Sequence, residues 1–102
     1  MIIVIASIKV KENSKNDFLN IFNKNVPKVL QEKGCIEYIP TVDHKTDIPV
    51  QVSDALMVTI IEKWESLEHL KAHFIAPHML QYKKDVANIV DKVSIKVLEP
   101  SN

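Results

Sequence analysis

The sequence predicts an α+β fold with an antiparallel sheet and the element order βαββαβ. Apolar residues recur at every second position in four stretches, and at spacings of three and four in the stretches between them. These are the periods of strands and helices. With 102 residues, 46% of them hydrophobic, the chain can build one modest core and is too short for two domains. We therefore expect a single domain over residues 1–102.

The first strand is predicted at residues 2–11 and is apolar on both faces. One face carries Ile2, Val4, Ala6, Ile8 and Val10, and the other begins with Ile3 and Ile5. Both faces should therefore be covered. Helices can cover one face, and in so short a chain the sheet of a second copy most easily covers the other. We therefore expect a homodimer formed through sheet faces and through the edge and C-terminal strands.

A polar break precedes the first predicted helix. Ser14 and Asp17 resemble a capping box with a shortened acid, and Gly34, the only glycine, stands where a left-handed helix stop is wanted. The expected buried stripe of this helix follows helical spacing. It consists of Phe18, Ile21, Phe22, Val26, Val29 and Leu30.

The second strand is predicted at residues 35–44, with Ile36, Tyr38, Pro40 and Val42 on one face. Because proline cannot donate a ladder hydrogen bond, this strand should lie at an edge of the sheet or carry a bulge. Residues 43–54 form a polar connection that either extends a hairpin or lies over a site.

The third strand is predicted at residues 55–64, and Glu62 and Trp64 continue the face of Val58 and Ile60. Ser66 can cap a helix over residues 67–74. Pro77 begins another helix, whose expected inner positions include Met79, Tyr82 and Val86, and residues 92–98 form the fourth strand.

Composition excludes several partners. Thirteen acidic and thirteen basic residues cancel, so no net field attracts nucleic acid or an anionic membrane. Every basic residue is lysine, which excludes the two-point binding of phosphate or carboxylate by arginine. The single Cys35 indicates a reducing compartment, and the apolar start of the chain is too short for a membrane span. We expect a cytoplasmic protein.

The sequence also favours chemistry without a cofactor. One glycine is too few for a dinucleotide loop, and the chain has no Ser-His-Asp arrangement. His69 and His73 have a spacing that can bind a metal, but a third ligand and the HExxH order are missing, which favours no metal. Cys35 has no neighbouring base and is expected to fill space.

Glu62 and His73 are the candidate catalytic residues. A carboxylate between Ile60 and Trp64 on an apolar face must be paired with a lysine, exposed at a cavity mouth, or raised in pKa so that it accepts a proton. His73 should face inward and titrate near neutrality. A two-turn helix spans about 12 Å, so His73 stays close to the strand before it.

We therefore expect a cavity between the sheet and residues 67–74, with Glu62 and His73 as its ionisable groups. Trp64, Tyr38 and Phe74 should be its walls and bind substrate, although Trp64 could equally be a packing residue. His78 is expected to hydrogen-bond a helix end.

Several motifs are spread over nearly the whole chain. They are Met1–Val10, Gly34-Cys35-x-x-Tyr38, Glu62-x-Trp64-Glu65-Ser66, Leu70-x-x-His73 and Ala76-Pro77-His78. In type, order and spacing they resemble the antibiotic biosynthesis monooxygenase domain family, especially its small quinol-monooxygenase-like proteins. The resemblance implies a ferredoxin-like fold that forms a dimeric α/β barrel, in which two four-stranded sheets pack face to face. It also implies that His73 is the helix histidine that acts on substrate.

Two departures bear on function. The 43–54 connection is longer than is usual in the family, and the arginine by which some members hold polyketides is absent. Where haem-degrading relatives have an asparagine, this chain has Ala6 and Ser7, which argues against haem chemistry.

Three functions fit these observations. The first is a cofactor-independent monooxygenase that oxidises a quinol or related small aromatic with O₂. The second is an isomerase or lyase that acts on a small carbonyl compound through His73 and Glu62. The third is a ligand-binding dimer without catalysis.

Overall fold

The computed structural model of residues 1–102 contains four strands and three helices in the predicted order. The strands are β1 (Ile2–Val10), β2 (Cys35–Thr41), β3 (Met57–Trp64) and β4 (Val90–Leu98). The helices are α1 (Lys15–Leu30), α2 (Leu67–Phe74) and α3 (Pro77–Val86). All strand pairs are antiparallel in the order β2-β3-β1-β4, so the sheet is open. The predicted fold class and the edge position of β2 are confirmed.

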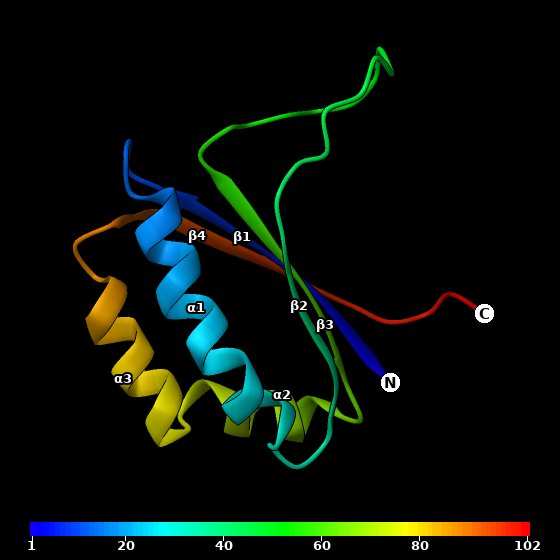
Figure 1. Cartoon of the computed structure of the whole chain (residues 1–102). Coiled ribbons are helices and arrows are strands. Elements are labelled where there is room, and N and C mark those ends of the chain that lie inside the picture. The colour runs from blue at the N-terminus through cyan, green and yellow to red at the C-terminus, as the bar shows by residue number, and fades with distance from the viewer.

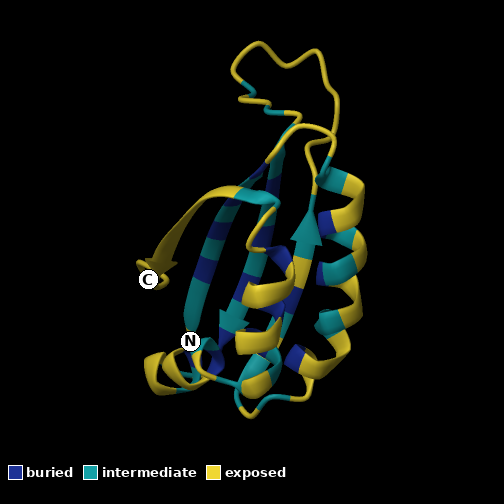
Figure 2. Cartoon of the chain, turned by 90° about the vertical axis from the view of Figure 1, so that its left-hand side faces the viewer, coloured by how far each residue is buried: buried dark blue, intermediate teal, exposed yellow.

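The helices form one layer on one face of the sheet. Helices α1 and α3 lie side by side over the strands, and α2 crosses the end of the sheet near the start of β2 (Figure 1). Buried residues lie on the strand and helix surfaces that face one another (Figure 2). The core therefore sits between the sheet and the helices.

The register of the sheet follows the predicted alternation. On the helix-facing side, β1 buries Val4, Ala6, Ile8 and Val10. Antiparallel pairing places Val4 opposite Glu62 and Ala6 opposite Ile60. On β2, Tyr38 pairs with Glu62. Paired residues share a face, so the strands bring Tyr38 and Glu62 together under the helices.

Two of the three predicted start signals of helices are found. The Ser66 hydroxyl accepts a hydrogen bond from the backbone N–H of His69 at 3.3 Å, and Pro77 is the first residue of α3. The capping box at Ser14 was wrong. Ser14 has helical backbone angles, with φ −108° and ψ −4°, and its hydroxyl lies 3.5 Å from the Glu12 carbonyl oxygen instead.

The predicted end of α1 is also corrected. The helix stops at Leu30, which is 49% exposed and does not belong to the buried stripe, although the preceding Val29 is fully buried. Gly34 does adopt a left-handed conformation, with φ +85°, but it does so in the turn that enters β2. Its carbonyl accepts a 2.8 Å hydrogen bond from Glu65 N–H, which ties this turn to the end of β3.

One predicted face of β2 is interrupted. Tyr38 is buried, but Ile36 is 47% exposed because the register shifts between Cys35 and Glu37. The extra residue is left out of the pairing.

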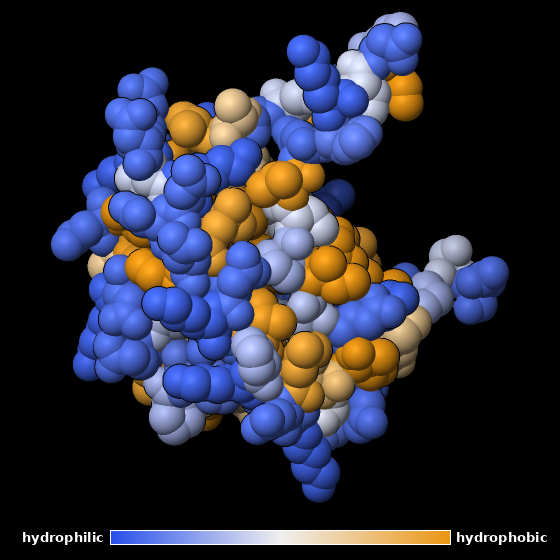
Figure 3. All heavy atoms as spheres, viewed as in Figure 1, coloured by the Kyte–Doolittle hydropathy of each residue, from blue (hydrophilic) through white to orange (hydrophobic).

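Two apolar surfaces of the sheet lack a cover. Ile3, Ile5, Ile39 and Ile61 lie on the face opposite the helices. On the helix-facing side, Val93, Ile95 and Val97 of β4 are 57%, 45% and 45% exposed, because no helix extends over β4. In Figure 3, hydrophobic atoms gather mainly over the region of the strands.

The connection between β2 and β3 contains no strand and projects beyond the end of the sheet (Figure 1). It is held by its own contacts, including a 2.8 Å hydrogen bond from Gln51 Nε2 to the His44 carbonyl. It therefore neither extends the hairpin nor covers the helix side of the sheet. No helix of the chain has both the length and the apolar composition that crossing a bilayer requires.

Candidate active site

A cavity of about 400 Å³ lies between the sheet and the helices, and we call it the sheet cavity. Sixteen residues line it, 13 of them hydrophobic, including Ile60, Phe22, Met79 and Val86. The uncovered residue Ile95 also lines it, so the cavity extends along β4. Its volume and apolar walls match those of sites that bind small molecules.

Glu62 is an ionisable residue in the wall of this cavity. It is 5% exposed, and its Oε1 accepts a 3.0 Å hydrogen bond from Trp64 Nε1. Burial raises the pKa of Glu62 from 4.5 to about 7, against the lowering effect of the Trp64 hydrogen bond. Glu62 forms no ion pair with lysine. The adjacent Lys63 lies on the other face of β3 and pairs with Glu37 at 3.5 Å. At neutral pH this carboxyl group can therefore either hold or release a proton.

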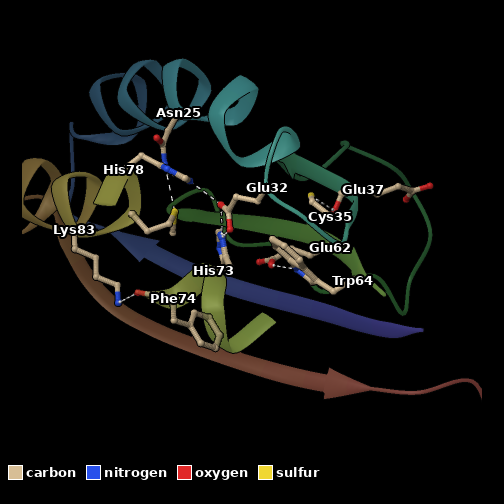
Figure 4. A network of polar contacts seen from close by, with 11 residues as sticks. Asn25, Glu32, Cys35, Glu37, Glu62, Trp64, His73, Phe74, His78 and Lys83 are labelled. Carbon is tan, nitrogen blue, oxygen red and sulfur yellow. Dashed lines mark hydrogen bonds and ion pairs between the residues drawn. The ribbon is translucent and has the colours of Figure 1, made fainter. Parts of the chain in front are cut away.

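His73 lies in the same cavity wall, on the last turn of α2. It is 1% exposed, and its ring centroid is 4.7 Å from that of Trp64 and 5.4 Å from that of Tyr38. Its Nδ1 is 2.8 Å from Glu32 Oε2 (Figure 4). Nε2 is the ring nitrogen without a protein partner. Burial lowers the pKa of His73, and Glu32 opposes that effect. His73 is therefore held mainly as a neutral imidazole.

The structure brings four of the five predicted site residues into one cavity wall. Glu62, His73, Tyr38 and Phe74 all line the sheet cavity. Trp64 does not line it. The indole is fully buried, and it hydrogen-bonds Glu62 and packs against the His73 ring. Its position supports the two ionisable groups and matches the packing alternative for Trp64.

Glu32 was missed by the sequence reasoning. It lies in the turn after α1, where an acidic residue looks like an ordinary surface group. Its carboxylate contacts His73 Nδ1 at 2.8 Å and His78 Nε2 at 2.7 Å. The expectation that His78 bonds a helix end is therefore replaced by this contact with Glu32. No local sequence signal joins residues so far apart in the chain.

Cys35 and His69 are the two other side chains considered for chemistry, and their contacts fit a structural role. Cys35 is partly buried, and burial together with the carboxylates of Glu32 and Glu62 raises its pKa to about 11, so the thiol stays protonated at neutral pH. His69 contacts the Ser66 hydroxyl at 2.7 Å through Nδ1. No group of three metal-ligating side chains is present.

The fold and the cavity together define a class of protein: an α+β ferredoxin-like domain with an apolar cavity between sheet and helices. Solved structures with the same fold include a Nitrosomonas europaea protein (TM-score 0.85, 16% identity, all of both chains covered). Another is PA3566 from Pseudomonas aeruginosa (TM-score 0.84, 20% identity, covering 99% of this chain and 94% of that one).

Sequence comparison identifies the family. The family model described as "Antibiotic biosynthesis monooxygenase" matches residues 1–85. A curated relative from Escherichia coli K12, named "Probable quinol monooxygenase YgiN", is 37% identical over an alignment of 102 positions that covers 98% of each chain. The chain belongs to the antibiotic biosynthesis monooxygenase family.

Proposed function

We propose that this protein is a cofactor-independent monooxygenase that oxidises a quinol or related small aromatic with O₂. The observation that carries the proposal is the position of His73: a neutral imidazole in the wall of an apolar cavity, with Nε2 free to accept a proton. Membership of the family, and the name of the E. coli relative, support the same reaction class.

In the proposed reaction the apolar walls bind the aromatic ring and exclude water. His73 Nε2 takes a phenolic proton, and the resulting anion gives an electron to O₂. One oxygen atom enters the ring and the other leaves as water, so a quinol C₆H₆O₂ and O₂ give a hydroxyquinone C₆H₄O₃ and H₂O. The substrate supplies all the electrons, and no external reductant is needed.

Two further groups have roles in this proposal. Glu62 accepts or returns a second proton, since its pKa lies at about 7. Lys83 lines the cavity and places a positive charge near the anion formed by deprotonation.

The test is oxygen uptake with a panel of hydroquinones, followed by mass spectrometry after reaction with ¹⁸O₂. We expect one labelled oxygen atom in the product and a loss in turnover of about 10² to 10⁴ for His73→Ala. His44→Ala, in the exposed loop, is the matched control and should leave turnover unchanged. Formation of unlabelled quinone, with both labelled oxygen atoms released as hydrogen peroxide, would contradict monooxygenation. Binding of a hydroquinone without oxygen uptake would favour a ligand-binding protein. Turnover of a carbonyl compound would favour an isomerase or lyase.

We also propose that the protein is a homodimer in the cytoplasm. The apolar face made of Ile3, Ile5, Ile39 and Ile61 is uncovered in a single chain. Burying such a face contributes roughly 25 cal/mol per Å². A second copy supplies the same face, as a two-fold dimer requires. The single half-buried thiol suits a reducing compartment.

A further inference from the structure

Glu32 stands between two histidines that belong to two different cavities. His73 lines the sheet cavity. His78 lines a separate groove of about 320 Å³ between α1 and α3, which we call the polar groove; its other walls include Lys24, Lys28 and Asp85. In Figure 4 the Glu32 side chain reaches between the two rings. Oxygen Oε2 is 2.8 Å from His73 Nδ1 and 2.7 Å from His78 Nε2.

The contact between Glu32 and His73 determines which nitrogen of the His73 ring carries the proton. His73 Nδ1 is also 3.1 Å from Glu32 Oε1, so both carboxylate oxygens face this ring. A carboxylate only accepts hydrogen bonds, so His73 must carry a proton on Nδ1. Nε2, which faces no protein partner, is then the unprotonated nitrogen. Contact with the carboxylate therefore selects the tautomer that can act as a base in the cavity.

Burial strengthens the effect of the Glu32 carboxylate on His73. The side chain of His73 is 2% exposed, that of Glu32 12% and that of His78 20%. An imidazolium formed by proton transfer to His73 would be deprived of water, and the nearby carboxylate is the group that offsets this loss. The orientation of the Glu32 carboxylate is fixed further by a second contact. His78 provides that contact from α3, outside the sheet cavity.

We propose that Glu32 is the positioning residue of this site: clamped by His78, it fixes His73 in the Nδ1–H tautomer and stabilises the imidazolium formed when Nε2 takes the substrate proton. This inference rests on the proposed function for its kinetic consequence, but its structural part concerns the free protein. Only a proton moves, from the substrate oxygen to Nε2, while the Nδ1 proton stays on the ring and is shared with Glu32. The parallel is with metal-site histidines oriented by an outer carboxylate, where loss of the carboxylate typically costs 10- to 100-fold.

Other charged and titratable groups surround His73. From the sheet these are Glu62 and Tyr38, and from α3 they are His78 and Lys83. Removing the Glu32 charge leaves His78 and Lys83, which both lower the pKa of His73. In Glu32→Gln the pKa of His73 should therefore fall below its value in the parent protein.

The experiment measures the chemical shifts of the histidine ring nitrogens in the ligand-free protein by ¹⁵N–¹H NMR across pH. It then measures kcat and KM with a quinol that the protein oxidises. For the parent protein we expect the Nδ1–H tautomer at His73. Glu32→Gln should lower its pKa and reduce kcat by about 10- to 100-fold with KM changed less than about threefold. Glu32→Asp, which keeps the charge, should recover part of the loss. His78→Ala should give a smaller loss in the same direction.

Glu37→Gln is the matched control, because it removes the carboxylate of the half-exposed pair with Lys63. It should leave the His73 signals and kcat unchanged. An Nε2–H tautomer at His73 in the parent protein, or unchanged His73 signals in folded Glu32→Gln, would overturn the inference. So would a Glu37→Gln loss as large as that of Glu32→Gln. If no quinol is oxidised, the proposed function fails, while the NMR result still decides the role of Glu32.

Discussion

Trp64 Nε1 donates a 3.0 Å hydrogen bond to Glu62 Oε1, two residues earlier on the same face of β3. The only tryptophan of the chain thus provides the hydrogen-bond partner of a buried carboxyl group. The bond favours the ionised form of Glu62, whereas burial favours the protonated form and has the larger effect. This balance sets the pKa of Glu62 near neutrality.

Trp64→Phe should upset that balance. Without the indole N–H, nothing offsets burial, so the pKa of Glu62 should rise above its value of about 7. The lost hydrogen bond and the smaller ring should together reduce the free energy of unfolding by about 2 to 4 kcal/mol. Titration of the Glu62 carboxyl carbon by ¹³C NMR checks the first effect, and urea unfolding the second. An unchanged Glu62 titration would contradict the role assigned to this bond.

The pH dependence of stability provides a second test of Glu62. Its pKa rises from 4.5 to about 7 on folding, so between these values the folded chain keeps a proton that the unfolded chain has lost. This contribution to the free energy of unfolding therefore falls as pH rises from 4.5 to 7, by up to about 3 kcal/mol. Glu62→Gln should remove it.

His73 contributes to the pH dependence of the free energy of unfolding with the opposite sign, so its contribution must be separated from that of Glu62. Its pKa is lowered from 6.5 on folding, so its contribution is present above pH 6.5 and is lost as pH falls through the lower folded pKa. The difference between parent and Glu62→Gln, measured by urea unfolding from pH 4.5 to 8 at one protein concentration, isolates Glu62. A difference that does not change with pH would show that Glu62 titrates normally.

The sequence predicted Glu62 and His73 in one site because the position of each side chain follows from nearby residues in the chain. Strand alternation fixes the face of Glu62, and the short helix after Ser66 keeps His73 near that face. Glu32 could not be predicted in this way. It lies 41 residues from His73 and 46 from His78 in the chain, and only the packing of α1 against α3 and the turn that enters β2 brings them together. The end of α1 was misplaced for a related reason: Gly34 has the expected left-handed backbone but serves a turn fixed by contacts with β3 and α2.

Gly34→Ala should be strongly destabilising for two separable reasons. The residue has φ +85°, and an added Cβ would collide with Cγ of the His69 ring. We expect a loss of about 1 to 3 kcal/mol in the free energy of unfolding. Combining it with His69→Ala should remove the collision with the ring, and a double-mutant cycle measures that share. The backbone cost and the approach of the added Cβ to the His69 Cβ, at 2.7 Å, should remain. Strict additivity of the two substitutions would show that the ring simply moves aside.

Ile61 tests the proposed dimer. It pairs with Ile5 of β1 and Ile39 of β2 on the sheet face that no helix covers. Because its side chain points away from the core, Ile61→Glu should leave the folded chain intact. In a sheet-to-sheet dimer, however, the new carboxylate would be buried without a partner, at a cost of several kcal/mol. Light scattering after size exclusion at micromolar concentration should therefore show a dimer for the parent and a monomer for Ile61→Glu. Leu80→Glu, on the exposed side of α3, is the matched control and should remain dimeric. A monomeric parent protein, or a dimer that Ile61→Glu leaves unchanged, would show that this face is not the interface.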